Sequence, residues 1–180
     1  MTIRLLSFLL AACLAACSPK YNWRDYASPD ARYRITFPAK PASATRAIDL
    51  DGMRVDMTMI AAEVDGVTFA VGSAEAPDAA RARVALDAMK LALLRNIGAD
   101  PARLNTASAS ASNDSSSRSA IDVDATGPDQ GGGTGRHQAM RLVGHFEARG
   151  KRFYQVIVVG RDKAVPPEQI EQFFTSFTLQ

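Results

Sequence analysis

The two cysteines are the first side chains in this sequence that could do chemistry. Cys13 and Cys17 both lie near the N-terminus of the 180-residue chain, so residues 18–180 contain no thiol. A domain without cysteine forms no disulfide, has no thiol nucleophile and offers no zinc–thiolate site. Any chemistry of the two cysteines is therefore confined to the N-terminal segment.

That segment has the order of a secretory signal peptide. Arg4 supplies a basic start, Leu5–Ala16 is an apolar run, and small residues precede Cys17. The run is too short to span a bilayer, which takes about 20 apolar residues. Leu14-Ala15-Ala16-Cys17 resembles the lipobox of bacterial lipoproteins. This resemblance implies cleavage before Cys17 and acylation of its thiol and its new amino group.

A second lipobox order, Leu10-Ala11-Ala12-Cys13, would leave only Leu5–Leu10 as the apolar run. Such runs usually have about 7–15 residues, so we favour Cys17 as the lipid attachment site. We expect residues 1–16 to be the signal peptide, 17–23 the lipidated cysteine and a tether, and 24–180 one domain. Ser18, rather than aspartate, follows the cysteine. By resemblance to enterobacterial sorting, this favours a lipid anchor in the outer membrane of the cell envelope, facing the periplasm.

Histidine and aspartate side chains could ligate a metal ion. His137 and His145 lie eight residues apart, about 26 Å along a strand, which is too far to share an ion. Asp122, Asp124 and Asp129 could gather a cation, but Ca²⁺ takes six to eight oxygens from a defined loop, and the sequence contains no such loop. We interpret the histidines as surface residues and the aspartates as a solvated strand face, and expect no metal site and no bound cofactor.

Methionines alternate along one predicted strand. Met53, Met57 and Met59 share a face with Val55, and thioethers bind Cu(I). The same spacing describes the core face of a strand, where methionine is an ordinary gap filler. We favour core packing and keep a small-ligand or copper carrier as the alternative function.

Nothing in the sequence indicates catalysis or nucleic-acid binding. The serines of 108–119 lie in a Ser/Ala-rich stretch without a nucleophile elbow, and Gly131–Gly135 lacks the Lys-Ser/Thr and the helix of a phosphate-binding loop. The full chain has a formal net charge of +2, and the basic residues of its predicted helix form no single stripe. We therefore expect no enzymatic activity and no nucleic-acid partner.

The hydrophobic pattern predicts a mixed α+β fold. Strands are expected at 33–37, 43–50, 53–62 and 67–73, with Asp51-Gly52 and Asp65-Gly66 as hairpin turns. A stripe of Ala82, Leu86, Met89, Leu93 and Ile97 predicts a helix over about 77–97. Further strands are expected at 104–111, 119–126, about 137–148 and 153–159, with a mobile loop at 127–135 and a short helix from Pro166.

Three motifs resemble those of the PsbP-like family. They are Tyr33-x-Ile35-x-Phe37-Pro38, Arg152-x-Tyr154 leading into Val156–Gly160, and Phe173-Phe174-x-Ser176-Phe177. The resemblance covers about residues 24–180. It implies an antiparallel sheet of about six strands flanked by helices, an α/β/α sandwich. It also implies a non-enzymatic binding or assembly role, and no functional residue of the family carries over to this chain. For a lipoprotein anchored in the envelope, we expect the partner to be another envelope protein.

Overall fold

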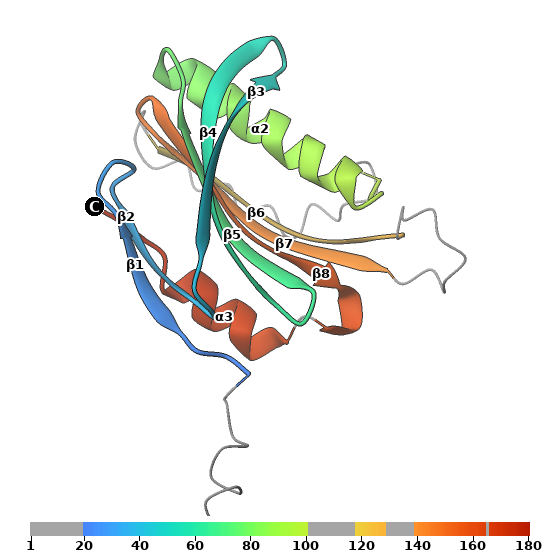
Figure 1. The fold of residues 1–180 in the computed structure, drawn as a ribbon. Helices are drawn as coiled ribbons and strands as arrows, with labels where there is room; N and C mark the ends of the chain where they lie inside the picture. Colours follow the sequence, from blue (N-terminus) through green and yellow to red (C-terminus); the bar gives the residue numbers. More distant parts are fainter. Residues whose placement is uncertain (1–19, 101–117, 129–138, 165) are drawn as a thin grey trace, which may run out of the picture.

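The computed structural model describes residues 20–100, 118–128, 139–164 and 166–180 (Figure 1). Within them lie two antiparallel sheets, two α-helices and a short 3-10 helix. The elements are β1 (Arg24–Ser28), β2 (Tyr33–Phe37), β3 (Ala42–Leu50), β4 (Met53–Val64), β5 (Val67–Glu75), α2 (Ala79–Asn96), β6 (Arg118–Gly127), β7 (Met140–Arg149), β8 (Arg152–Arg161), η4 (Asp162–Ala164), α3 (Pro167–Thr175) and β9 (Thr178–Leu179).

The larger sheet has six strands in the order β3-β4-β5-β8-β7-β6, and the smaller has the order β1-β2-β9. The predicted α+β class with a six-stranded antiparallel sheet is therefore confirmed. The two predicted hairpins, β3-β4 and β4-β5, are also confirmed, and their turns are as expected. Asp51 and Gly52 have φ of 55° and 80°, and Asp65 and Gly66 have φ of 50° and 74°, the left-handed conformation of tight hairpins.

The chain crosses from β5 to the far edge of the sheet through α2. The helix begins two residues later than the sequence predicts, because Asp78 acts as its N-cap and accepts a 2.8 Å hydrogen bond from the Arg81 N–H. Gly98, at φ 70°, follows the C-cap residue Ile97 and ends the helix. The buried positions include Leu86 and Leu94, whereas Leu93 of the predicted stripe is only partly buried.

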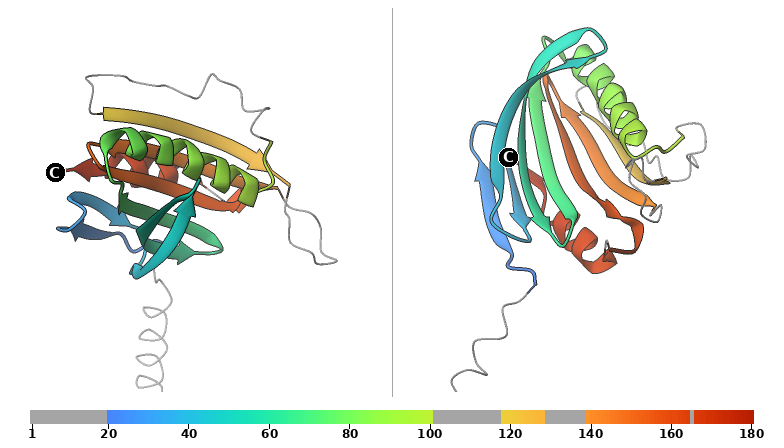
Figure 2. Two further views of the ribbon diagram at one scale, coloured as in Figure 1. Left: turned by 90° about the horizontal axis from the view of Figure 1, so that it is seen from above. Right: turned by 45° about the vertical axis from the view of Figure 1, so that its right-hand side comes forward.

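The two faces of the six-stranded sheet carry separate cores. On one face α2 packs over β6, β7 and β8, and aliphatic side chains and methionines fill the space. On the other face lie α3 and the three-stranded sheet, with a core rich in aromatic rings. Figure 2 shows α2 and the β1–β2 hairpin on opposite sides of the curved sheet. Strand β8 is central and buried on both faces, as its continuous apolar sequence predicts.

Three findings differ from the sequence-based expectations. The strands β1 and β9 of the smaller sheet were not predicted. Gly127, expected to open a mobile loop, ends strand β6, and a Cβ built on it would lie 2.1 Å from the Ile97 carbonyl oxygen. Lys20–Trp23, the last four residues of the predicted tether, lie on the domain, where Trp23 packs edge-on against Phe69. The predicted strand at 104–111 lies outside the described residues.

No helix in the described parts of the chain is long and apolar enough to cross a membrane.

Candidate functional site

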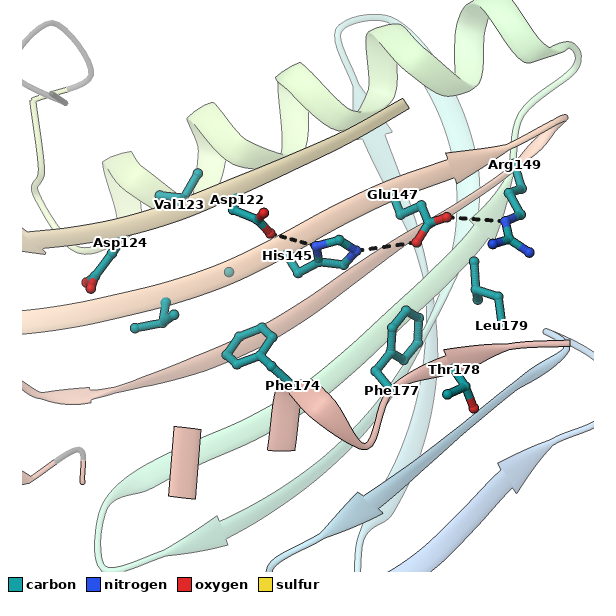
Figure 3. Close-up of a pocket in the computed structure, with 12 residues that line it drawn as sticks. Asp122, Val123, Asp124, His145, Glu147, Arg149, Phe174, Phe177, Thr178 and Leu179 are labelled. Atoms are coloured by element: carbon teal, nitrogen blue, oxygen red, sulfur yellow. Dashed lines mark hydrogen bonds and ion pairs between the residues drawn. The ribbon is translucent and has the colours of Figure 1, made fainter. Parts of the chain in front are cut away.

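An open groove of about 610 Å³ lies beside strands β6 and β7. It exists because the second face of the large sheet is only partly covered. The aromatic core there is built on β4, β5 and β8, and among the described residues it includes none from β6 or β7. Side chains of β6 and β7 on this face therefore form one wall of a groove, and α3 and β9 form the other (Figure 3).

Four ionisable side chains form a row on the sheet wall. Nδ1 of His145 lies 2.6 Å from Oδ1 of Asp122, and its Nε2 lies 3.4 Å from Oε2 of Glu147. The second carboxylate oxygen of Glu147 accepts a 3.2 Å hydrogen bond from Nε of Arg149. Figure 3 shows the continuous row from Asp122 on β6 to Arg149 at the end of β7.

The strand period and the register of β6 against β7 produce this row. His145, Glu147 and Arg149 alternate along β7, so all three point to the same face. Asp122 lies directly opposite His145 in the β6–β7 pair. Asp124, on the same face of β6, accepts hydrogen bonds of 2.9 and 2.7 Å from Arg141. Acidic residues on β6 therefore meet basic residues on β7 across the strand pair.

Burial in the row is greatest at Glu147. Asp122 is exposed, the His145 side chain retains 22% of its exposure, and the Glu147 side chain retains 4%. Glu147 is thus a buried carboxylate in a row of partly exposed partners. Buried charges in proteins are normally paired and hydrogen-bonded, and His145 and Arg149 supply those partners here.

Two opposing effects act on the pKa of His145. Burial, the larger single effect, lowers it, but the hydrogen bonds and charges of Glu147 and Asp122 together outweigh burial and raise the pKa above its ordinary value of 6.5. Carboxylates flank both ring nitrogens, and only the protonated ring can donate to both. The geometry and the pKa shift therefore agree on an imidazolium that bridges two carboxylates.

The side chains of the row engage one another rather than a common centre. A general base needs a ring nitrogen free to accept a proton from a nucleophile, and both nitrogens of His145 already face carboxylates. Asp122 and Glu147 lie on opposite sides of the imidazole, so they do not converge on one ion. Across the described residues, no group of three or more His, Cys, Asp or Glu side chains could hold a metal ion.

The opposite wall of the groove is apolar and partly aromatic. Phe174 comes from α3, Phe177 follows that helix, and Leu179 belongs to β9. The ring of Phe177 lies 6.2 Å from that of His145 and 6.1 Å from that of Tyr154. The groove thus offers charge on one side and apolar surface on the other.

The structure brings some of the sequence candidates together and separates others. Asp122, Asp124 and His145 meet in the groove, where the aspartates form ion pairs rather than a bare solvated face. Cys17, His137, Asp129, the glycines 131–135 and the serines 108–117 lie outside the described residues. Sequence reasoning did not find the Glu147–Arg149 pair or the wall of Phe174 and Phe177. The alternation of acids on β6 against bases on β7 is the signal that could have indicated the row.

The methionines take the core role predicted for them. Met53 and Met57 are buried with Val55 in the cluster beneath α2, and Met59 packs against that cluster. The Met59 sulfur accepts a 3.2 Å hydrogen bond from the Gln155 side-chain amide. No observation on the described residues favours a copper site at this strand.

A second, more polar groove of about 460 Å³ lies where the β1–β2 turn meets β3, β4 and β5. Hydroxyl groups line it, and Thr45 and Thr58 hydrogen bond to each other at 2.9 Å. Arg152 bridges the Glu75 carboxylate and the Asp30 carbonyl oxygen at its edge. The first groove is the larger of the two and has an apolar wall of Phe174, Phe177 and Leu179 facing its ionisable row, so we place the candidate site there.

Comparison with known proteins identifies no family. No family model matches the sequence, and no curated protein matches it. A similar solved structure is a Bacteroides thetaiotaomicron protein at 1.50 Å resolution, with 12% identity and a TM-score of 0.46. The match covers 87% of this chain and 48% of that one, so this chain spans about half the length of its structural neighbour. A likeness at this level carries no argument about function.

Proposed function

We propose that this protein is a lipoprotein of the cell envelope that acts as a non-enzymatic binding or assembly module. It is anchored through Cys17 in the outer membrane and faces the periplasm. The observation that carries the binding role is the groove between β6–β7 and α3–β9, where a row of ionisable residues faces an apolar wall. The groove suits a protein segment that presents both charged and apolar side chains, in keeping with an envelope protein as partner.

Two features support binding rather than catalysis. The charged groups of the groove pair with one another, and both nitrogens of the histidine are engaged by carboxylates. Such a row discriminates among ligands by charge, because a ligand that places like charges side by side is repelled. The apolar wall supplies area that a ligand can remove from water.

We also propose that the fold is a PsbP-like sandwich. Support comes from the helices on opposite faces of the antiparallel sheet and from the positions of the three motifs. Tyr33, Phe37 and Phe173 all lie in the aromatic core. The Phe37 and Phe173 rings are 5.5 Å apart, so the first and last motifs meet in space.

Site-specific photocrosslinking in intact cells tests the groove. A photoreactive residue replaces Asp124, which is exposed in the groove and paired with Arg141. The matched control replaces Asp87, which is exposed on α2 and paired with Lys90. We expect a crosslinked partner from position 124 and none from position 87. Equal adducts from both positions, or an adduct from position 87 alone, would remove the groove as the binding surface.

Metabolic labelling with a fatty acid tests the anchor. Cys17→Ser should abolish labelling and membrane retention, whereas Cys13→Ser should change neither. High salt should fail to extract the acylated protein, because several acyl chains hold it without help from surface charge. Labelling that survives Cys17→Ser but not Cys13→Ser would move the anchor to Cys13.

A further inference from the structure

The first described residues of the chain are attached to one end of the domain. Lys20 forms a 2.8 Å ion pair with Asp65 in the β4–β5 turn. The Asn22 N–H donates to the Pro38 carbonyl at 2.8 Å, and Trp23 packs against Phe69 of β5. The chain therefore enters the fold beside the β4–β5 turn (Figure 1).

Only two residues, Ser18 and Pro19, separate the predicted lipidated cysteine from Lys20. Three residue steps of extended chain span at most about 11 Å. A lipid on Cys17 therefore holds the β4–β5 turn within about one helix diameter of the bilayer surface. A loosely tethered domain would instead need a link long enough for the domain to turn freely.

We infer that the end of the domain bearing the β4–β5 turn and η4 lies against the lipid bilayer. The long direction of the groove, which follows β7, then points away from the membrane. This inference rests on the proposed acylation of Cys17. The partner at this end is a lipid surface. The short link to the lipid anchor keeps the domain in contact with it.

The strand register defines the two ends of the molecule. Thr68, just after the β4–β5 turn, pairs with Val159, and the Asp162 N–H donates to the Ala139 carbonyl at 2.8 Å. The β4–β5 turn, η4 and the start of β7 therefore share the membrane end. Glu75 pairs with Arg152 at the other end of β5. It lies about 27 Å along the strand from Val67, the first residue of β5.

The groove runs along β7 between these two ends. Its Arg141–Asp124 pair lies toward the membrane, because Met140 pairs with Arg161 beside η4. Its Arg149 end lies far from the membrane, at the β7–β8 turn. A partner held in the groove would therefore reach the bilayer at the Arg141 end and the periplasm at the Arg149 end.

Charge on the membrane end is mixed rather than basic. Lys40, Arg161 and Lys163 are exposed there. Glu63 and Glu168 are also exposed at this end, and Lys20 is paired with Asp65. A surface of both signs gains little from anionic lipids, which attract clusters of basic residues. The orientation should therefore be set by the tether and be the same on uncharged vesicles.

Fluorescence quenching on vesicles tests the orientation. The processed full-length lipoprotein carries no cysteine beyond the acylated Cys17, so one added cysteine can be labelled selectively. Lys163→Cys places a fluorophore in η4, and the matched Lys151→Cys places one in the β7–β8 turn. Phosphatidylcholine vesicles with a nitroxide on the lipid headgroup supply the quencher. We expect most of the fluorescence at position 163 to be lost and that at position 151 to be retained.

A longer tether provides the control. Twenty Gly/Ser residues inserted after Pro19 give a flexible link with an end-to-end distance of about 25 Å, and the difference between the two labels should disappear. Equal quenching in the lipidated chain without the insertion would overturn the inference alone. So would a difference that survives the insertion, because the surface and not the tether would then orient the domain. A chain that carries no lipid would overturn the proposed function, and the orientation with it.

Discussion

Strand β7 has one apolar and one charged face, although it is a single strand in a single sheet. Leu142, Phe146 and Ala148 are buried beneath α2. The alternate residues His145, Glu147 and Arg149 form the ionic row of the groove. The apolar face is covered along the strand by a helix, whereas the charged face is only bordered by α3 and β9.

This contrast indicates where specificity can reside in such a fold. A sheet face that is completely covered by other elements needs apolar side chains, because it is removed from water. Such a face stabilises the fold but offers no groups that a ligand can reach. Incomplete cover leaves room for ionisable groups that hold one another in place. The mutations below separate the two roles, since changes beneath α2 should affect stability and changes in the groove should mainly affect electrostatics.

The largest expected effect is on the face beneath α2. Leu86 is completely buried in that core, so Leu86→Ala should lower the free energy of unfolding by about 2–5 kcal/mol, through lost transfer energy and the cavity that remains. Chemical denaturation followed by circular dichroism measures the loss.

Two positions on the same helix serve as controls. Val84 is 57% exposed, and Val84→Ala should change stability by less than about 0.5 kcal/mol. Leu93→Ala should give an intermediate loss, because Leu93 is only partly buried. A loss at Leu86 no larger than that at Val84 would show that α2 does not cover this face.

The next effect concerns the contact between β6 and the end of α2. A Cβ on Gly127 would lie 2.1 Å from the Ile97 carbonyl oxygen and 2.6 Å from the Ala99 nitrogen. Both are backbone atoms that cannot move aside alone, so Gly127→Ala should cost about 1–3 kcal/mol. The exposed neighbour provides the control, and Thr126→Ala should stay within about 0.5 kcal/mol of wild type. An unchanged melting temperature for Gly127→Ala would return this residue to the mobile loop that the sequence predicts.

The sequence predicted the local elements well because each has a local cause. Asp-Gly pairs specify the two tight turns, the apolar period specifies α2, and a run apolar on both faces specifies the central strand β8. The strands β1 and β9 could not be predicted in the same way. They are short, one face of β1 is exposed, and β9 pairs through only two residues, with Tyr33 and Arg34 of β2.

The candidate site was predicted less well for a related reason. Asp122 and His145 lie 23 residues apart, and only the register of β6 against β7 brings them opposite each other. Phe174 and Phe177 belong to a motif that predicts packing in the core, and no feature of the neighbouring sequence indicates that they border a groove. The groove exists because α3 and the smaller sheet cover only part of this face of the large sheet. Where those elements end on the face is a property of the tertiary structure, which no local sequence pattern specifies.

A smaller effect is expected from the buried carboxylate of the groove. Glu147→Ala removes one of the two carboxylates beside His145, which keeps Asp122, and the carboxylate beside Arg149. His145 and Arg149 are both partly exposed to solvent. The cost should therefore be only about 1 kcal/mol, and the pKa of His145 should fall. The exposed Glu63 is the control, since Glu63→Ala should change neither stability nor the His145 titration. A pKa of His145 that is unchanged in Glu147→Ala would remove Glu147 from the row.

The smallest effect is a pH dependence that only the charged face should show. The carboxylates raise the pKa of His145 above 6.5 in the folded protein. The protonated ring therefore stabilises the fold fully below pH 6.5, and this stabilisation is lost as the pH rises through the raised pKa. The difference in unfolding free energy between wild type and His145→Gln should shrink as the pH rises above 6.5 and through the raised pKa. Taking this difference removes the contribution of His137, which both proteins share.

Proton NMR of the imidazole measures the pKa directly, and the signal missing from His145→Gln assigns it. A value below 6.5 would mean that burial outweighs the two carboxylates, and the difference would then grow with pH instead of shrinking.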